Sequence, residues 1–137
     1  MNCGIVYYSA RKTSFCEKAL KKSFADLGLN LSSAVFATKK EAFGDALMKS
    51  FEQSDAVFTV GGLEFEDSRS IRDIVSQAAA ASHPTFCRKL KNEQGDDGFI
   101  IRAGKQLLVM LPDEPEQITD MMNGVLAAYI KQCLHEV

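Results

Sequence analysis

The chain has 137 residues, 46% of them apolar and 25% charged, and its 16 Lys and Arg nearly balance 18 Asp and Glu, for a formal net charge of -2. This composition predicts a single globular domain over residues 1–137 with an ordinary core. Without a basic field, general binding to nucleic acid or to an anionic membrane is excluded. No apolar run approaches the roughly 20 residues of a membrane helix, and the chain opens without a signal pattern, so we expect a cytoplasmic protein.

The cysteines and histidines of the chain do not indicate a metal or disulfide framework. The four cysteines are scattered, with no Cys-x-x-Cys pair, and we expect reduced, mostly buried thiols. Neither histidine is predicted to act as a base or a metal ligand. The residues are Cys3, Cys16, Cys87, Cys133, His83 and His135.

A strand and a capped helix open the chain. Residues 3–8 (CGIVYY) form a short apolar run rich in β-formers, which predicts a strand. A polar loop over residues 9–14 follows. We expect Ser14 to cap a helix, with Glu17 as its capping-box partner, and Gly28 to end it.

The same order of elements then repeats. Residues 29–36 predict a second strand, and a second helix extends to about Phe51. Thr38 and Glu41 have the spacing of a capping box, which places the start of this helix.

The third strand is the most apolar. Residues 56–60 (AVFTV) show almost no polar alternation, as expected for a strand covered on both faces. The strand continues directly into Gly61 and Gly62. A third helix is expected from about Ser68 to Ala81.

The rest of the chain predicts two weaker strands, a buried strand and a helix. Residues 86–90 and 99–102 flank a polar turn, Gly-Asp-Asp-Gly, and are read as a hairpin or a pair of edge strands. Residues 107–111 (LLVML) form a buried strand. After the turn at residues 112–115, one long amphipathic helix is expected to extend to Cys133.

Strands that alternate with helices imply right-handed crossovers and parallel pairing. The predicted fold class is therefore α/β, a three-layer α/β/α sandwich with a mostly parallel sheet. In such sheets ligands bind beyond the carboxyl ends of the strands. The candidate loops are accordingly residues 9–14, 61–67 and 112–115.

The loop after the third strand is the most informative. Gly61 and Gly62 precede a helix start, where glycine lets backbone N–H groups approach an anion that the helix dipole favours. The plain alternative is a tight strand-to-helix turn, for which glycine is the usual residue.

Two longer segments carry a family resemblance. The segment SDAVFTVGGLEFEDSRSIRDIVSQAA and the later GKQLLVMLPDEP resemble the molybdopterin-binding domain of the molybdenum cofactor biosynthesis family (MoaB/MogA-like), and also the N-terminal domain of CinA-like competence/damage-inducible proteins. The family patterns are Thr-Gly-Gly-Thr/Leu-Gly and Leu-Pro-Gly-x-Pro. With CEKALKKSFADLGLNL upstream, the resemblance spans nearly the whole chain.

The resemblance implies a molybdopterin-binding-domain-like fold, a molybdopterin, other pterin or nucleotide ligand, and a homo-oligomer, often a trimer. An active member would be a molybdopterin adenylyltransferase or process a nucleotide phosphate, chemistry that depends on positioning and metal electrostatics. No catalytic nucleophile or base stands out. The implied ligand-binding residues are a backbone cradle, two anion contacts and the prolines of the companion turn: Gly61, Gly62, Leu63, Ser68, Arg69, Pro112 and Pro115. A surface ion pair with Glu66 or Asp73 is the ordinary alternative for Arg69 and Arg72.

The chain departs from the family pattern by gaining carboxylates. Glu64 replaces the last loop glycine, Glu66 and either Asp67 or Arg69 stand at the Thr/Ser and Asp positions, and Asp113 replaces the glycine of the second pattern. Carboxylates repel phosphate and offset the roughly 0.3–1 kcal/mol that a helix N-terminus offers an anion. The second hypothesis is therefore a non-enzymatic relative that keeps the fold as a binding or assembly module.

The same carboxylates support a metal hypothesis. If the two loops meet at one sheet edge, Glu64, Glu66 and Asp67 come near Asp113 and Glu114. Such a cluster suits Mg²⁺, with Glu66 or Asp67 as ligand and the metal bridging to a phosphate. The alternative is a solvated acidic loop.

A flavodoxin-like FMN-binding protein is the remaining alternative. GIVYYSARKTS is similar to the phosphate loop of flavodoxins, and its hydroxyls and two cations suit a phosphate at a helix start. The loop lacks the Gly-Asn-Thr of that family, and the chain has no Trp to stack on a flavin. An N-capping loop with exposed basic residues explains the same sequence.

Overall fold

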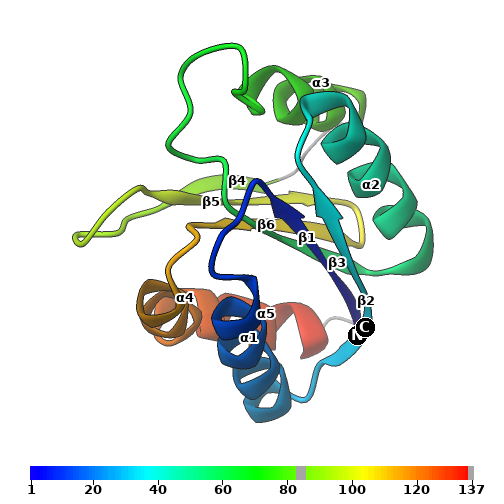
Figure 1. Cartoon of the computed structure of the whole chain (residues 1–137). Coiled ribbons are helices and arrows are strands. Elements are labelled where there is room, and N and C mark those ends of the chain that lie inside the picture. Colours follow the sequence, from blue (N-terminus) through cyan, green and yellow to red (C-terminus); the bar gives the residue numbers. More distant parts are fainter. Residues whose placement is uncertain (83–85, 136–137) are drawn as a thin grey trace.

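The computed structural model describes residues 1–82 and 86–135, which form one six-stranded sheet and five helices (Figure 1). The strands follow the spatial order β2-β1-β3-β6-β5-β4. The elements are β1 (Asn2–Tyr8), α1 (Thr13–Leu27), β2 (Asn30–Ala37), α2 (Lys40–Gln53), β3 (Ala56–Val60), α3 (Arg72–Ser82), β4 (Phe86–Leu90), β5 (Gly98–Ala103), β6 (Gln106–Leu111), α4 (Pro115–Met122) and α5 (Val125–His135).

The predicted three-layer α/β/α architecture is confirmed. Helices α1, α4 and α5 cover one face of the sheet, and α2 and α3 cover the other (Figure 1). Strands β1, β2, β3 and β6 are parallel, whereas β4 and β5 form an antiparallel hairpin that joins β6. Of the two alternatives for this region, the hairpin is correct. The order also differs from the flavodoxin order 2-1-3-4-5.

The strand β3 is completely buried, as its uniform apolar sequence predicts. Its side chains alternate between two hydrophobic cores, one on each face of the sheet. Phe58 packs on Phe24 of α1, with ring centroids 4.8 Å apart, and Val57 joins the core beneath α2 and α3. Burial on both faces fixes β3 at the centre of the sheet, so its carboxyl end is a well-defined position for a loop.

Both predicted capping boxes are wrong. In α1 the amide of Cys16 donates to the carbonyl of Lys12, so the helix begins at Thr13 and Ser14 already lies within its first turn. The residue at the N-cap of α2 is Lys39, and neither helix has a side-chain cap from its own segment. For α1, the first free amides find their partner far along the chain, as described below.

The third helix starts later than predicted, at Arg72 instead of Ser68. The cause is Asp67, which forms a turn of its own. Its carboxylate accepts the amide of Arg69 at 2.9 Å and its carbonyl accepts the amide of Ser70 at 3.0 Å. Side chains that bond nearby amides in this way compete with helix formation.

The single long C-terminal helix is also wrong, because α4 and α5 are separate. The chain breaks at Gly124, whose φ of +85° is left-handed, a conformation that glycine adopts without strain. Asn123 ends α4, and its Nδ2 donates to the carbonyl of Thr119 at 2.8 Å.

The cysteine prediction is largely confirmed. Cys3, Cys16 and Cys133 are buried free thiols, and Cys87 is exposed on β4. His83 lies outside the described residues. No helix within residues 1–82 and 86–135 is long and apolar enough to cross a membrane.

Candidate functional site

Three loops meet at one edge of the sheet. Because β1, β3 and β6 are parallel neighbours, their carboxyl ends deliver residues 9–12, 61–71 and 112–114 to the same side of the molecule (Figure 1). These are the loops that the sequence predicted as candidates. The carboxyl edge of a parallel sheet is where α/β proteins bind ligands.

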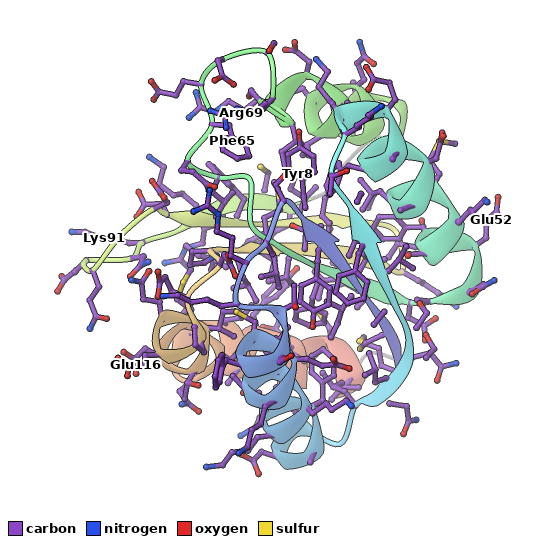
Figure 2. All side chains as sticks on the ribbon, in the orientation of Figure 1. Tyr8, Glu52, Phe65, Arg69, Lys91 and Glu116 are labelled. Atoms are coloured by element: carbon purple, nitrogen blue, oxygen red, sulfur yellow. The ribbon has the colours of Figure 1, made fainter. Side chains whose placement is uncertain are left out.

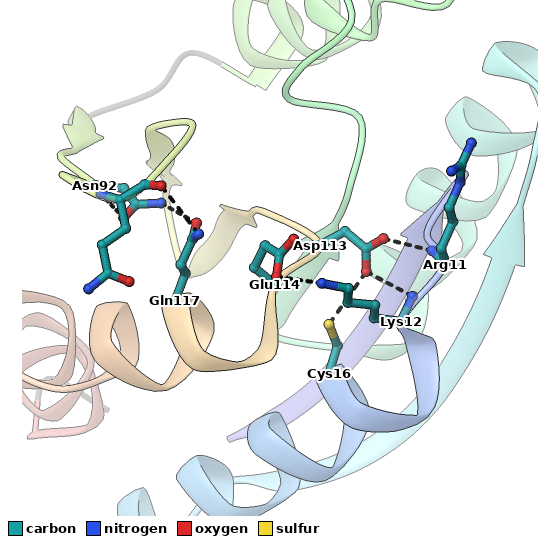
Figure 3. A network of polar contacts seen from close by, with 8 residues as sticks. Arg11, Lys12, Cys16, Asn92, Asp113, Glu114 and Gln117 are labelled. Atoms are coloured by element: carbon teal, nitrogen blue, oxygen red, sulfur yellow. Dashed lines mark hydrogen bonds and ion pairs between the residues drawn. The ribbon is translucent and has the colours of Figure 1, made fainter.

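An intramolecular carboxylate occupies the start of α1. The carboxylate of Asp113 accepts the amide of Arg11 at 2.7 Å and the amide of Lys12 at 3.2 Å, and lies 3.5 Å from Sγ of Cys16 (Figure 3). Beside it, Nζ of Lys12 forms an ion pair with Glu114 at 2.8 Å. Amides at a helix N-terminus attract anions. Asp113 therefore occupies these two amides and ties the first loop to the last.

The Cys16 thiol at this contact is held in its neutral form. Burial raises the pKa of Cys16 to about 12, and the neighbouring Asp113 carboxylate adds to the shift. A neutral thiol can donate its proton to the carboxylate, which is consistent with the contact between Sγ and Asp113. The thiolate that nucleophilic chemistry requires is therefore disfavoured at Cys16.

Gly61 and Gly62 are buried and take positive φ angles of +94° and +84°. A Cβ on Gly61 would lie 2.5 Å from the carbonyl oxygen of Tyr8, and one on Gly62 would collide with the Tyr8 ring. The amide of Gly61 donates to the carbonyl of Leu111 at 3.0 Å. The glycines thus allow β3 to approach the end of β1 closely, and the tight-turn explanation has a direct structural basis. The exposed part of the loop begins beyond them.

A stack of Tyr8, Phe65 and Arg69 holds the β3–α3 loop in place (Figure 2). The Tyr8 hydroxyl donates to the carbonyl of Arg69 at 2.6 Å. The Phe65 ring meets Tyr8 edge-on, with centroids 6.0 Å apart, and the Arg69 guanidinium lies 4.0 Å above the Phe65 ring. Cation–π contacts of this kind orient a guanidinium without removing it from water.

Arg69 forms its ion pair with Asp67 and not with Glu66. Its Nη2 lies 2.8 Å and its Nε 3.1 Å from the Asp67 carboxylate oxygens. The hydrogen bonds from Arg69 lower the pKa of Asp67 to about 2. Both side chains are more than half exposed, so water competes with the pair. Arg69 is therefore an oriented cation at the sheet edge, and water can replace Asp67 as its partner.

Three of the five predicted acidic residues are paired separately, and Glu64 and Glu66 are exposed. Asp67 faces Arg69, Asp113 faces the amides of α1, and Glu114 faces Lys12. Across residues 1–82 and 86–135, no group of three or more His, Cys, Asp or Glu side chains lies close enough together to hold a metal ion. Any Mg²⁺ at this edge would therefore need ligand oxygens as well as carboxylates.

The remaining predicted site residues have mixed environments. Leu63 is half-buried against the core beneath α2 and α3, and Ser68 is exposed. Pro112 is buried, and Pro115 occupies the first turn of α4, where a missing N–H costs nothing. Leu63 and the prolines therefore have clear packing or helix-start roles.

Sequence reasoning missed two residues that shape this edge, Tyr8 and Phe65. Tyr8 was read only as the end of the first strand, although it contacts both glycines and the carbonyl of Arg69. A glycine pair after a buried strand signals that another chain segment approaches closely. The large residue ending the neighbouring strand was the candidate for that approach.

The strand order, the antiparallel hairpin and the Gly-Gly loop at the carboxyl edge define a MoaB/MogA/CinA-like α/β fold. No family model and no curated protein matches the chain by sequence. Solved structures match over nearly the full length. The molybdopterin biosynthesis Mog protein from Mycobacterium ulcerans is 20% identical with a TM-score of 0.76, covering 98% of this chain and 97% of that one.

Two further solved structures share the fold. The protein CinA from Thermoplasma acidophilum, described as of unknown function, is 17% identical with a TM-score of 0.73, covering 97% of this chain and 99% of that one. The molybdopterin biosynthesis enzyme MoaB from Thermus thermophilus is 15% identical with a TM-score of 0.71, covering 96% of this chain and 93% of that one. These similarities establish the fold that the sequence resemblance predicted.

Proposed function

We propose that this protein is a MoaB/MogA-like molybdopterin-binding protein that binds a pterin or nucleotide phosphate at the edge formed by residues 9–12, 61–71 and 112–114. The observation that carries the proposal is the fold shared over nearly the whole chain with proteins described as molybdopterin biosynthesis proteins. A shared fold alone leaves function open. The chemistry of the edge must therefore support an anionic ligand.

The residues at this edge suit an anion. The amides of Arg11 and Lys12, the Lys12 ammonium and the Arg69 guanidinium all lie in the three loops. Each of these donors has a carboxylate partner, a geometry that also suits the oxygens of a phosphate. A bound phosphate would replace Asp113 at the amides or Asp67 at Arg69, and its affinity is reduced by the cost of displacing them.

In this proposal Arg69 is the principal ligand contact, because Phe65 and Tyr8 orient it from below. Ser68 lies next to it on the exposed part of the loop. Mg²⁺, if required, would bring charge compensation between a phosphate and the carboxylates Glu66 and Asp67. A homo-oligomer, with the trimer implied by resemblance, belongs to the same proposal and is tested by sedimentation equilibrium.

A specific observation also favours the second candidate, a binding or assembly module without a cofactor. The Arg11 and Lys12 amides, the Lys12 ammonium and the Arg69 guanidinium each have a carboxylate partner in the same chain. Where the related pattern has glycine, the Asp113 side chain fills the start of α1. A protein that no longer binds a phosphate has no need to keep those donors available.

A thermal-shift titration separates the two candidates. The protein is titrated with a stable pterin phosphate, ATP and FMN, each with and without Mg²⁺. A ligand that binds only the folded state stabilises it by about 2.7 kcal/mol at a hundred times its Kd. We expect the pterin phosphate or ATP to raise Tm, and the Asp113→Gly variant to show a larger rise, because the Arg11 and Lys12 amides are then free.

The matched control is Asp96→Gly, which removes the same charge from the exposed β4–β5 turn. It should respond to ligand as the unmodified protein does. If neither the unmodified protein nor Asp113→Gly responds to a pterin phosphate or ATP, the ligand-binding proposal is wrong and the module is favoured. A response to FMN alone would favour the flavodoxin-like alternative. A response to ATP with Mg²⁺ justifies an adenylyl-transfer assay.

A further inference from the structure

The sheet has an open edge at β4. This strand is the last in the spatial order, and Cys87, Arg88 and Lys89 are exposed along it. The outer side of an edge strand presents backbone N–H and C=O groups that a second strand can pair with. An extended peptide binds such an edge through its main chain and places alternate side chains in neighbouring pockets.

A groove lies next to this edge, between β4 and α5. A hollow of about 460 Å³ has Leu90, Ile100 and Leu126 among its lining residues, and all three are otherwise buried. Val125 also lines it, with 60% of its surface exposed. A second hollow of about 380 Å³ continues along the β4–β5 turn, and Leu90, Val125 and Leu126 line both. The groove therefore offers apolar contacts beside a strand edge.

Cations outnumber carboxylates on the walls of the groove. Arg88 is the charged residue that lines the first hollow, and the second is lined by Arg88, Lys89 and Lys91 together with Glu93 and Asp120. Arg88 lines both hollows and forms no ion pair with the residues that the structure describes. The contact of Lys89 with Asp97 is long, at 3.8 Å. This local cationic excess contrasts with the net charge of -2 over the whole chain.

We propose that β4 and the groove bind an extended acidic segment of a partner protein by strand addition. The partner's backbone pairs with the outer edge of β4, an apolar side chain enters between Leu90 and Val125, and a carboxylate meets Arg88. Electrostatic complementarity of this kind selects the partner and its register. The groove shares no residue with the three loops of the candidate ligand site, so this proposal is independent of ligand binding.

The charge pattern argues against a second copy of this chain as the occupant. Antiparallel pairing of two β4 strands about their centres would bring Arg88 of both copies together, and directly opposed like charges destabilise a strand pair. An acidic strand removes that repulsion. Arg88 and Lys89 together therefore favour an acidic partner.

The test uses the full chain and a fluorescent peptide of repeated Glu-Thr-Val-Thr, which places glutamate and valine in turn on one face, because Arg88 and Leu90 share a face of β4. Fluorescence anisotropy measures its binding. A second peptide has lysine in place of glutamate, and a third carries N-methyl groups on alternate amides, which block strand pairing. We expect only the first peptide to bind, and more weakly as salt increases. Chemical-shift changes in NMR spectra should map to residues 86–91 and Val125.

The decisive variant is Arg88→Glu, compared with Lys49→Glu on α2, which makes the same charge change at an exposed position on the other side of the sheet. Arg88→Glu should weaken binding by about tenfold or more, and Lys49→Glu should not. Equal binding of the glutamate and lysine peptides, binding of the N-methylated peptide, or an unchanged affinity in Arg88→Glu would overturn the proposal. If no peptide binds, the proposal is also wrong, and the charges of β4 only protect the strand edge from aggregation. If the protein dimerises and Arg88→Glu blocks the dimer, the edge of β4 pairs two copies of this chain.

Discussion

Two carboxylates at the same sheet edge hold cationic or amide donors in different ways. Asp113 reaches Arg11 across 102 positions in sequence and fastens the last loop to the first. Asp67 reaches Arg69 across two positions and shapes only its own loop. Asp113 is part-buried and bonds two backbone amides, whereas both partners of the Asp67 pair are exposed side chains.

The difference shows which contacts matter for stability and which for recognition. A carboxylate on helix N-terminal amides satisfies donors that otherwise lack a partner, and it acts as a cap supplied from elsewhere in the chain. An exposed ion pair exchanges readily with water and contributes little. We therefore expect Asp113 to affect folding and the Asp67–Arg69 pair to affect ligand exchange.

The largest effect on stability should come from Gly61, directly after the end of β3. Gly61→Ala places a Cβ 2.5 Å from the Tyr8 carbonyl oxygen at a φ of +94°, and it should lower the free energy of unfolding by about 3 kcal/mol or more. Urea unfolding measures the loss. Gly104→Ala is the control, because its φ is +61° with nothing within 4 Å of the added Cβ, so only about 1 kcal/mol of backbone strain applies. Equal losses in both variants would show that the Tyr8 contact is unimportant.

The next largest effect concerns the contact of Asp113 with the Arg11 and Lys12 amides, which is a long-range clamp between the last loop and the first. Asp113→Ala leaves the Arg11 and Lys12 amides without their carboxylate and should cost about 1–2 kcal/mol, as the loss of an N-cap does. Asp67→Ala is the matched comparison and should lower the urea midpoint less, because water screens its exposed ion pair with Arg69. If the two variants have the same stability, the distinction between the clamp and the surface pair fails.

The Asp67–Arg69 ion pair should be detectable from the titration of the Asp67 carboxyl group. Because the pKa of Asp67 is lowered, the ion pair stabilises the folded protein at pH values above the unfolded Asp pKa near 3.9. This stabilisation is lost as the pH falls to about 2. NMR titration of the Asp67 carboxyl should give a midpoint near 2, and Arg69→Gln should raise it part of the way to the ordinary value, because the backbone amide at position 69 still donates to the carboxylate. A midpoint that Arg69→Gln leaves unchanged would contradict the contact.

The smallest effect concerns thiol reactivity. At about pH 8 a thiol reagent should modify Cys87 rapidly and leave Cys3 and Cys16 unmodified, because burial raises the pKa of Cys3 and of Cys16 to about 12. All four cysteines should react in denaturant, which is the control. Rapid modification of Cys16 in the native protein would show that the Asp113 clamp opens frequently.

Much of the fold was predictable because the strands carry strong local signals. The uniform apolar run of β3 indicated burial on both faces, and the polar turn between residues 90 and 98 indicated the hairpin. The helix boundaries were less predictable. Asp67 and Gly124 each redirect the backbone through local geometry. The spacing of apolar residues continues across both positions and therefore does not indicate where the helix starts or ends.

The candidate site was predictable in location but not in detail. Parallel pairing brings the three loops together, as the order of elements implied. The partners of the carboxylates were not predictable, because the contact of Asp113 with Arg11 depends on tertiary packing across the whole chain. Glu66 and Asp67 were expected to lie with Asp113, whereas Asp67 pairs with Arg69 and Asp113 bonds the Arg11 and Lys12 amides.

The register of the sheet also has a consequence for how the chain folds. Within the hairpin, Leu90 pairs with Gly98, whereas β3 joins Cys3 on one side and Leu107 on the other. Local contacts form quickly, and distant ones wait for the entropy of closing long loops. The hairpin should therefore gain amide protection early in refolding, while the central sheet becomes protected only when β6 inserts beside β3 and completes it.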